Sequence, residues 1–89
     1  MPEKTTVDLA FAVLEEAASK GRRCPTNLEL AAEIASRGGA RLAGQSMPGF
    51  LRVLTRGGRI VVQIYARNWR QVIICTGAHA GKKDAPTGG

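Results

Sequence analysis

The sequence predicts one small α+β domain in which three amphipathic helices precede a β-hairpin. Apolar residues recur at helical spacing in three segments before residue 57, and two runs rich in β-branched residues follow. Glycine pairs at 38–39 and 57–58 mark the ends of the second and third helical segments. With 89 residues, 44% of them hydrophobic, the chain can bury one compact core and has no repeat that would indicate a second domain.

The first two helices carry clear start signals. Thr5 or Thr6 can cap a helix over about 6–20, which ends before Gly21. Its apolar stripe comprises Val7, Ala10, Phe11, Leu14 and Ala18. After a connector at 22–25, Thr26 and Glu29 form a capping-box pattern for a second helix that ends near Arg37. We expect the core face of that helix to hold Leu28, Ala31, Ala32, Ile34 and Ala35.

The third helix is expected over about 46–57, after a loop at 38–45. Ser46 can cap it, and Pro48 in the first turn loses no helical hydrogen bond. We expect its buried side to comprise Phe50, Leu51, Val53 and Leu54, and its exposed side Pro48, Gly49, Arg52, Thr55 and Arg56.

Two strands are expected at 60–65 and 71–76, with the turn between them. Alternation places Ile60, Val62 and Ile64 on one strand face, which we expect to cover the helices. The domain then spans 1–76, and the Gly-, Ala-, Lys- and Pro-rich residues 77–89 are expected to form a flexible basic tail.

The charge is distributed unevenly along the chain. The net charge is +6, yet the first 20 residues carry more acids than bases, and no acid lies between Glu33 and Asp84. Residues 46–76 hold five arginines, namely Arg52, Arg56, Arg59, Arg67 and Arg70. Because the planar guanidinium donates paired hydrogen bonds to phosphate and guanine, this pattern favours a surface that binds a polyanion.

Three segments resemble parts of known DNA-binding proteins. Residues 28–34 resemble the first half of a bacterial helix-turn-helix, and 46–54 resemble a recognition helix. Gly58-Arg59-Ile60 resembles the step that leads from that helix into the wing. Over about 6–76 the chain therefore resembles bacterial and phage winged helix-turn-helix proteins, with the wing at about 59–76. The link between helices two and three is longer than the usual turn of 3–4 residues.

The resemblance implies double-stranded DNA as the partner, with helix three in the major groove. It makes Gln45, Ser46, Pro48, Gly49 and Arg52 candidate base contacts and Arg56 and Arg59 candidate phosphate contacts. The hairpin tip, Arg67, Asn68, Trp69 and Arg70, would contact the DNA backbone or minor groove. Trp69 is equally suited to packing against Tyr65 or helix one, or to stacking on an unpaired RNA base, and RNA is the less favoured partner.

The same residues leave the biological role open between three alternatives. A transcriptional regulator would read bases, commonly as a homodimer on two half-sites. A nucleoid-type architectural protein would rely on phosphates and groove shape. The glycine and proline at the head of helix three offer few side chains for base reading, which keeps this alternative open. A protein-interaction module would instead dock a partner on an exposed apolar face.

Enzymatic chemistry is not expected. Cys24, Cys75 and His79 lack the spacing of a zinc site, and His79 has no catalytic partner in the sequence. Gly81-Lys82-Lys83 lacks the hydroxyl residue and following helix of a phosphate loop. We expect no metal and no cofactor. No signal-peptide pattern or apolar run of membrane-spanning length is found, so a cytoplasmic, nucleoid-associated protein is expected.

Overall fold

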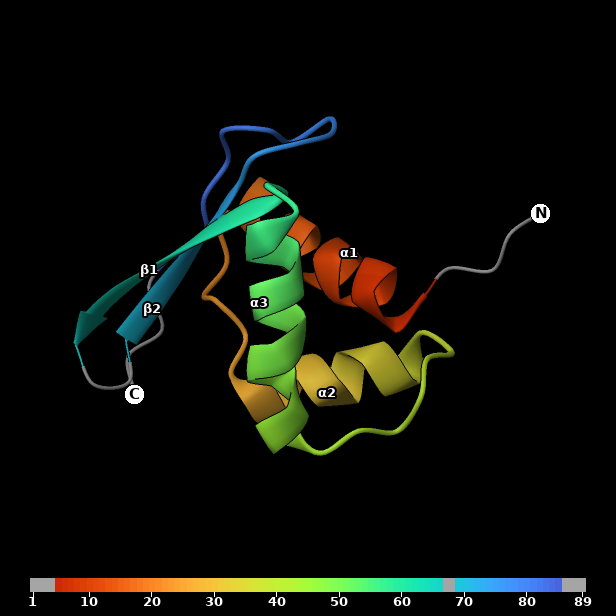
Figure 1. Cartoon of the computed structure of the whole chain (residues 1–89). Helices are drawn as coiled ribbons and strands as arrows, with labels where there is room; N and C mark the ends of the chain where they lie inside the picture. Colours follow the sequence, from red (N-terminus) through yellow and green to blue (C-terminus); the bar gives the residue numbers. More distant parts are fainter. Residues whose placement is uncertain (1–4, 67–68, 86–89) are drawn as a thin grey trace.

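The computed structural model describes residues 5–66 and 69–85. It is an α+β structure in which three helices precede a two-stranded antiparallel sheet, as the sequence predicts. The elements are α1 (Thr6–Ser19), α2 (Asn27–Ser36), a 3-10 turn η1 (Gly44–Ser46), α3 (Met47–Arg56), β1 (Ile60–Ala66) and β2 (Trp69–Ile74). Helix α3 crosses in front of α1 and α2, and the hairpin starts at its C-terminal end (Figure 1).

Helices α1 and α2 both begin at complete capping boxes. In α1 the cap is Thr5, whose hydroxyl accepts a hydrogen bond from the Asp8 N–H, while the Asp8 carboxylate accepts one from the Thr5 N–H. In α2 the predicted pair, Thr26 and Glu29, makes the same reciprocal bonds. Both starts are therefore fixed by bonds between residues three positions apart.

Helix α3 starts differently from the prediction. Ser46 belongs to η1, its backbone is helical, and its side chain makes no capping bond. The Ser46 N–H instead donates to the Ala43 carbonyl, 3.0 Å away. The 3-10 turn thus leads directly into α3 and takes the place of a side-chain cap.

The core lies where the three helices meet the inner face of the hairpin. Side chains from the three α-helices and both strands are buried there, including Leu14, Leu30, Ile34, Met47, Leu54, Ile60, Val72 and Ile74. Three predicted core residues are wrong, because Leu28 is 76% exposed, Val53 is 54% exposed, and Ala32 is exposed as well. Each ten-residue helix buries three residues, so the predicted apolar faces were too wide.

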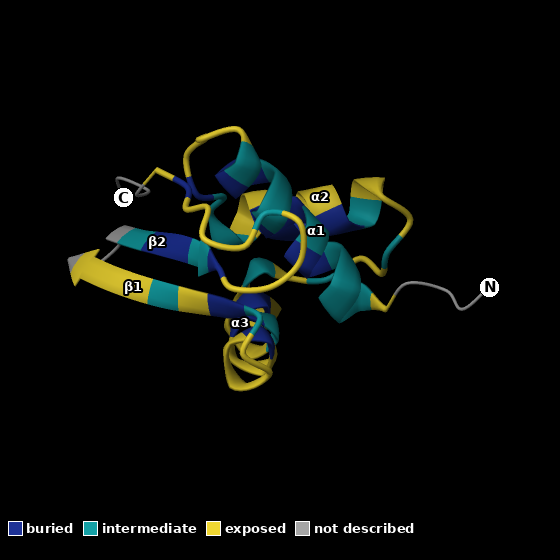
Figure 2. Ribbon diagram, turned by 90° about the horizontal axis from the view of Figure 1, so that it is seen from above, coloured by how far each residue is buried: buried dark blue, intermediate teal, exposed yellow. Residues whose placement is uncertain are grey.

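The hairpin reaches beyond this core. Its register pairs Ile60 with Ile74, Val62 with Val72 and Ile64 with Arg70, and an irregularity follows Ile64. Ile60 and Val62 cover the helices as predicted, but Ile64 on the same face is 75% exposed. The outer half of the hairpin extends past the helices (Figures 1 and 2). Strand β2 also begins and ends two residues earlier than the predicted strand at 71–76.

Residues 77–85 do not form the separate tail that we expected from composition. The Ile74 N–H donates to the Lys82 carbonyl (2.8 Å), and the Asp84 N–H donates to the Val72 carbonyl (3.2 Å). Ala85 in turn exchanges backbone bonds with the α1–α2 connector, from its own N–H to the Arg22 carbonyl and from the Cys24 N–H to its carbonyl. Four extended segments therefore lie side by side. Their order is the α1–α2 connector, residues 82–85, β2 and β1.

The described residues contain no helix that is long and apolar enough to cross a membrane.

Candidate nucleic-acid interface

The outward face of α3 contains two arginines that have no partner among the described residues. Arg52 and Arg56 lie one turn apart and are exposed, and neither bonds to another described residue. Pro48 and Gly49 are also exposed, and a Cβ atom added at Gly49 would meet nothing within 4 Å. Gln45 and Ser46 are exposed in the preceding turn. The structure thus brings these six predicted site residues to one end and one face of α3.

Arg59 is placed differently from the prediction of a free phosphate contact. Its guanidinium lies 3.0 Å from the Asp8 carboxylate of α1 and 4.1 Å from the centroid of the Phe11 ring. Hydrogen bonds from Thr5, followed by that from Arg59, lower the pKa of Asp8 below its ordinary value. Arg59 therefore joins the start of β1 to α1, which leaves its guanidinium less available to a ligand.

Arg70 is also used within the fold. Its Nη1 donates to Asn27 Oδ1 and its Nη2 to the Pro25 carbonyl, both at 2.7 Å. These bonds join β2 to the N-terminal end of α2, away from the hairpin tip where we expected Arg70 to contact DNA. Of the other predicted tip residues, Arg67, Asn68 and the side chain of Trp69 lie outside the described residues.

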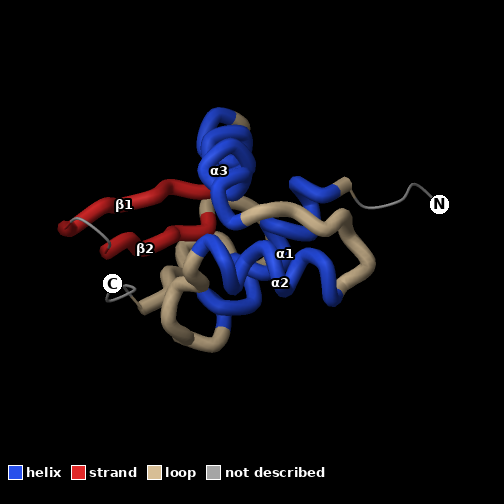
Figure 3. The backbone as a smooth tube through the Cα atoms, turned by 90° about the horizontal axis from the view of Figure 1, so that it is seen from below, coloured by secondary structure: helices blue, strands red, loops and turns tan. Residues whose placement is uncertain are grey.

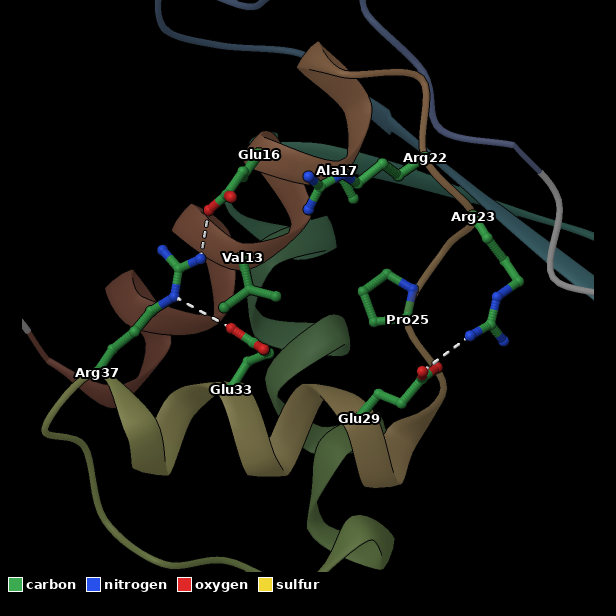
Figure 4. Close-up of a pocket in the computed structure, with 9 residues that line it drawn as sticks. All are labelled: Val13, Glu16, Ala17, Arg22, Arg23, Pro25, Glu29, Glu33 and Arg37. Carbon is green, nitrogen blue, oxygen red and sulfur yellow. Dashed lines mark hydrogen bonds and ion pairs between the residues drawn. The ribbon is translucent and has the colours of Figure 1, made fainter.

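The acidic residues that the structure describes gather on α1 and α2. Around a cleft of about 330 Å³ between these helices, Arg37 bonds Glu16 and lies 3.7 Å from Glu33, and Arg23 bonds Glu29 at 2.8 Å (Figure 4). The hydrogen bond from Arg37, then that from Lys20, lowers the pKa of Glu16 to about 2. The charges lining the cleft are largely neutralised by one another.

The sixth described acid, Asp84, is buried rather than paired with a cation. It is 2% exposed, and its Oδ1 accepts a hydrogen bond from the Val72 N–H at 2.9 Å. Burial raises its pKa above the ordinary value, although the Val72 N–H, the Cys24 thiol and Arg70 oppose that rise. Sequence reasoning missed this residue, because nothing in the composition of 77–85 indicated burial.

The result is a molecule with different charge patterns on its two sides. Helix α3 and β1 lie on the same side, with α1 and α2 behind them (Figures 2 and 3). The arginines of α3 have no partner on that side among the residues that the structure describes. Four of the five carboxylates of α1 and α2 are held close to arginine or lysine, the exception being Glu15. This side of the molecule therefore presents positive charge to an approaching anion.

The candidate metal ligands from the sequence are dispersed. Cys24 is buried beside Asp84, and Cys75 is exposed at the end of β2. Within residues 5–66 and 69–85, no three His, Cys, Asp or Glu side chains are close enough to hold a metal ion.

No family model, curated protein or solved structure matches this chain.

Proposed function

We propose that this protein is a winged helix-turn-helix module that binds double-stranded DNA. In this proposal α2 and α3 form the helix-turn-helix, α3 enters the major groove, and the β1–β2 hairpin is the wing. The order of the elements and the position of the hairpin beside α3 support this assignment (Figure 1).

The observation that carries the proposal is the state of Arg52 and Arg56. Arg59 and Arg70 of the same acid-free stretch bond to α1 and to the start of α2, whereas Arg41, in the loop after α2, is exposed and has no described partner either. Arg52 and Arg56 are exposed and unpaired among the described residues, on a helix face that otherwise presents small or neutral side chains. A repeated negative charge at phosphate spacing is the partner such a face suits best.

The head of α3 favours sequence-tolerant binding over strict base reading. Pro48 and Gly49 occupy the positions that would come closest to base edges, and neither side chain can donate or accept a hydrogen bond. Base reading then depends on Gln45, Ser46 and Arg52. An architectural role, in which phosphate contacts and groove shape dominate, is therefore the second candidate beside a transcriptional regulator.

The test compares single alanine variants in duplex binding over a salt series. We expect Arg52→Ala and Arg56→Ala to weaken binding, and each lost phosphate contact to reduce the slope of log K against log salt by about 1. Arg22→Ala is the matched control, because it removes the same charge from an exposed arginine on the α1–α2 side. It should change the affinity far less.

The outcomes separate the candidates. Absence of duplex binding by the unchanged protein at low salt would overturn the proposal, as would equal losses in Arg22→Ala and Arg52→Ala. A regulator should lose discrimination between duplex sequences when Arg52 is replaced, by about 1–3 kcal/mol at the base that it contacts. An architectural protein should lose affinity for all sequences alike.

A further inference from the structure

Strand β1 is the outer strand of the sheet, and its edge is open up to the irregularity that follows Ile64. It bonds to β2 on one side, and no backbone bond joins its other side to any part of the chain that the structure describes. Its sequence, Ile-Val-Val-Gln-Ile-Tyr-Ala, contains no charged residue and no proline. Natural proteins generally block exposed edges with such residues, because an open edge pairs with other strands.

The register identifies the backbone groups that face outward. The Cys75 N–H donates to the Arg59 carbonyl, so the alternation of an antiparallel ladder places the bonds to β2 at Val61 and Gln63. The N–H and C=O groups of Val62 and Ile64 therefore point to the free edge. Strand β2 follows the same alternation. Its residues Val72 and Ile74 direct their backbone groups away from β1 and bond to residues 81–84.

The exposed apolar side chains also concentrate on this strand. Among the described residues five large apolar side chains are exposed, and three of them, Val61, Ile64 and Tyr65, belong to β1. Val61 and Tyr65 lie on its outer face and Ile64 on its inner face. Apolar side chains on both faces are typical of a strand that is covered on both faces.

We propose that β1 pairs with β1 of a second copy of this chain in an antiparallel dimer centred on Gln63. In this register Val62 and Ile64 of one copy face Ile64 and Val62 of the other, so the outward backbone groups of both residues are bonded. Val61 then faces Tyr65 across the interface, and each exposed apolar side chain of β1 gains an apolar neighbour.

A second copy suits this edge better than an unrelated strand for two reasons. The strand is uncharged, so two copies can approach here although the chain carries a net charge of +6. The pattern around Gln63 is also self-complementary, as a two-fold interface requires. Since the free edge and the exposed face of α3 lie on the same side (Figures 2 and 3), self-pairing would compete with duplex binding. This last statement rests on the proposed function, whereas the pairing itself does not.

A cross-linking experiment tests the register. In the proposed dimer Gln63 faces Gln63 of the other copy as a non-hydrogen-bonded pair, whose Cα separation of about 4.5 Å permits a disulfide. The background is Cys75→Ser, because Cys75 is exposed and Cys24 is buried. Under mild oxidation we expect Gln63→Cys to form a covalent dimer. The control, Val61→Cys in the same background, lies on the same face but opposite Tyr65, so it should stay monomeric.

Two results would overturn the pairing, namely no cross-linked Gln63→Cys dimer or equal cross-linking of the Val61→Cys control. Sedimentation of the otherwise unchanged protein provides a second measurement, in which Ile64→Lys should lose the dimer while keeping the fold, because Ile64 is 75% exposed. A protein that sediments as a monomer would contradict the proposal and leave the edge to a strand of another protein.

Adding a DNA duplex separates this inference from the proposed function. If both hold, duplex should reduce the cross-linking of Gln63→Cys. If duplex binds and the cross-linking of Gln63→Cys is not reduced, only the expected competition between self-pairing and duplex binding is contradicted. If no duplex binds but the cross-link forms, the pairing is supported and the DNA proposal fails.

Discussion

The two sides of this molecule use arginine differently. On the α1–α2 side, Arg23 and Arg37 neutralise the carboxylates that line the cleft, and Arg59 and Arg70 reach across to the same helices. On the α3 side, Arg52 and Arg56 have no partner among the described residues. A count of positive charges along the sequence treats these residues as equal, but Arg52 and Arg56 keep their hydrogen-bonding capacity for a ligand. Among the described arginines, Arg22 and Arg41 are also exposed without a side-chain partner, but they lie in loops rather than together on one helix face.

The largest expected effect is on the free energy of unfolding, and it tests which face of α3 is buried. Leu54 is fully buried and its neighbour Val53 is 54% exposed. Leu54→Ala should lower the free energy of unfolding by about 2–5 kcal/mol, because it leaves a cavity. Val53→Ala should change it by no more than about 0.5 kcal/mol. Urea unfolding measures both, and similar losses in the two variants would contradict the assigned orientation of α3.

The next effect distinguishes a structural arginine from an unpaired one. Arg70→Ala removes both donors from Asn27 and the Pro25 carbonyl, so the free energy of unfolding should fall by about 1–3 kcal/mol. Arg52→Ala should leave it within about 0.5 kcal/mol of the original value. The thermal unfolding of both variants should be recorded beside their duplex affinities. If Arg70→Ala keeps the original stability but binds duplex much more weakly, Arg70 contacts DNA as the sequence predicted and its structural role is contradicted.

A smaller loss is expected for Arg59. Its ion pair with Asp8 is largely screened by solvent, so most of the effect of Arg59→Ala should come from the contact with the Phe11 ring, about 0.5–1 kcal/mol. Arg56→Ala serves as the comparison, because it removes the same charge without breaking a described contact. Equal unfolding midpoints for the two variants would show that the Arg59 contacts add nothing to stability.

The smallest effect concerns the exposed carboxylate of Glu16. Its pKa in the folded protein is about 2, well below its ordinary value of 4.5, so ionised Glu16 favours the folded state above pH 4.5. That contribution is lost as the pH falls from 4.5 towards 2. Glu16→Gln should therefore show a flatter dependence of the unfolding midpoint on pH in this range. Added salt should shrink the difference between the two proteins, and a difference that grows instead would contradict the ion-pair explanation.

The parts of the fold that sequence predicted well are those set by neighbouring residues. The capping box at Thr26 depends on residues three positions apart, the cap of α1 at Thr5 or Thr6 depends on the start of its apolar stripe, and the hairpin depends on two adjacent β-branched runs. The exposed face of α3 followed from helical spacing in the same way. Each of these features is decided within one element, so a single sequence is enough to find it.

The parts that sequence missed depend on contacts between distant segments. Arg70 bonds to residues about 45 positions earlier, and Arg59 pairs with Asp8 across 51 positions. The spacing of apolar residues cannot reveal such contacts. It also placed Leu28 and Val53 in the core, because it shows which residues are apolar but not how wide the buried stripe of the helix is. Residues 77–85 were misassigned for the same reason, since their composition resembles that of a linker.

The bonds between Ala85 and the α1–α2 connector also constrain when the protein can finish folding. The Arg22 carbonyl and the Cys24 N–H remain without their native partner until residue 85 is available. Contacts between such distant residues slow folding, because a long stretch of chain must close before they form. During synthesis, α1, α2 and α3 can gather as soon as they leave the ribosome. The connector can only be locked in place once residue 85 has emerged as well.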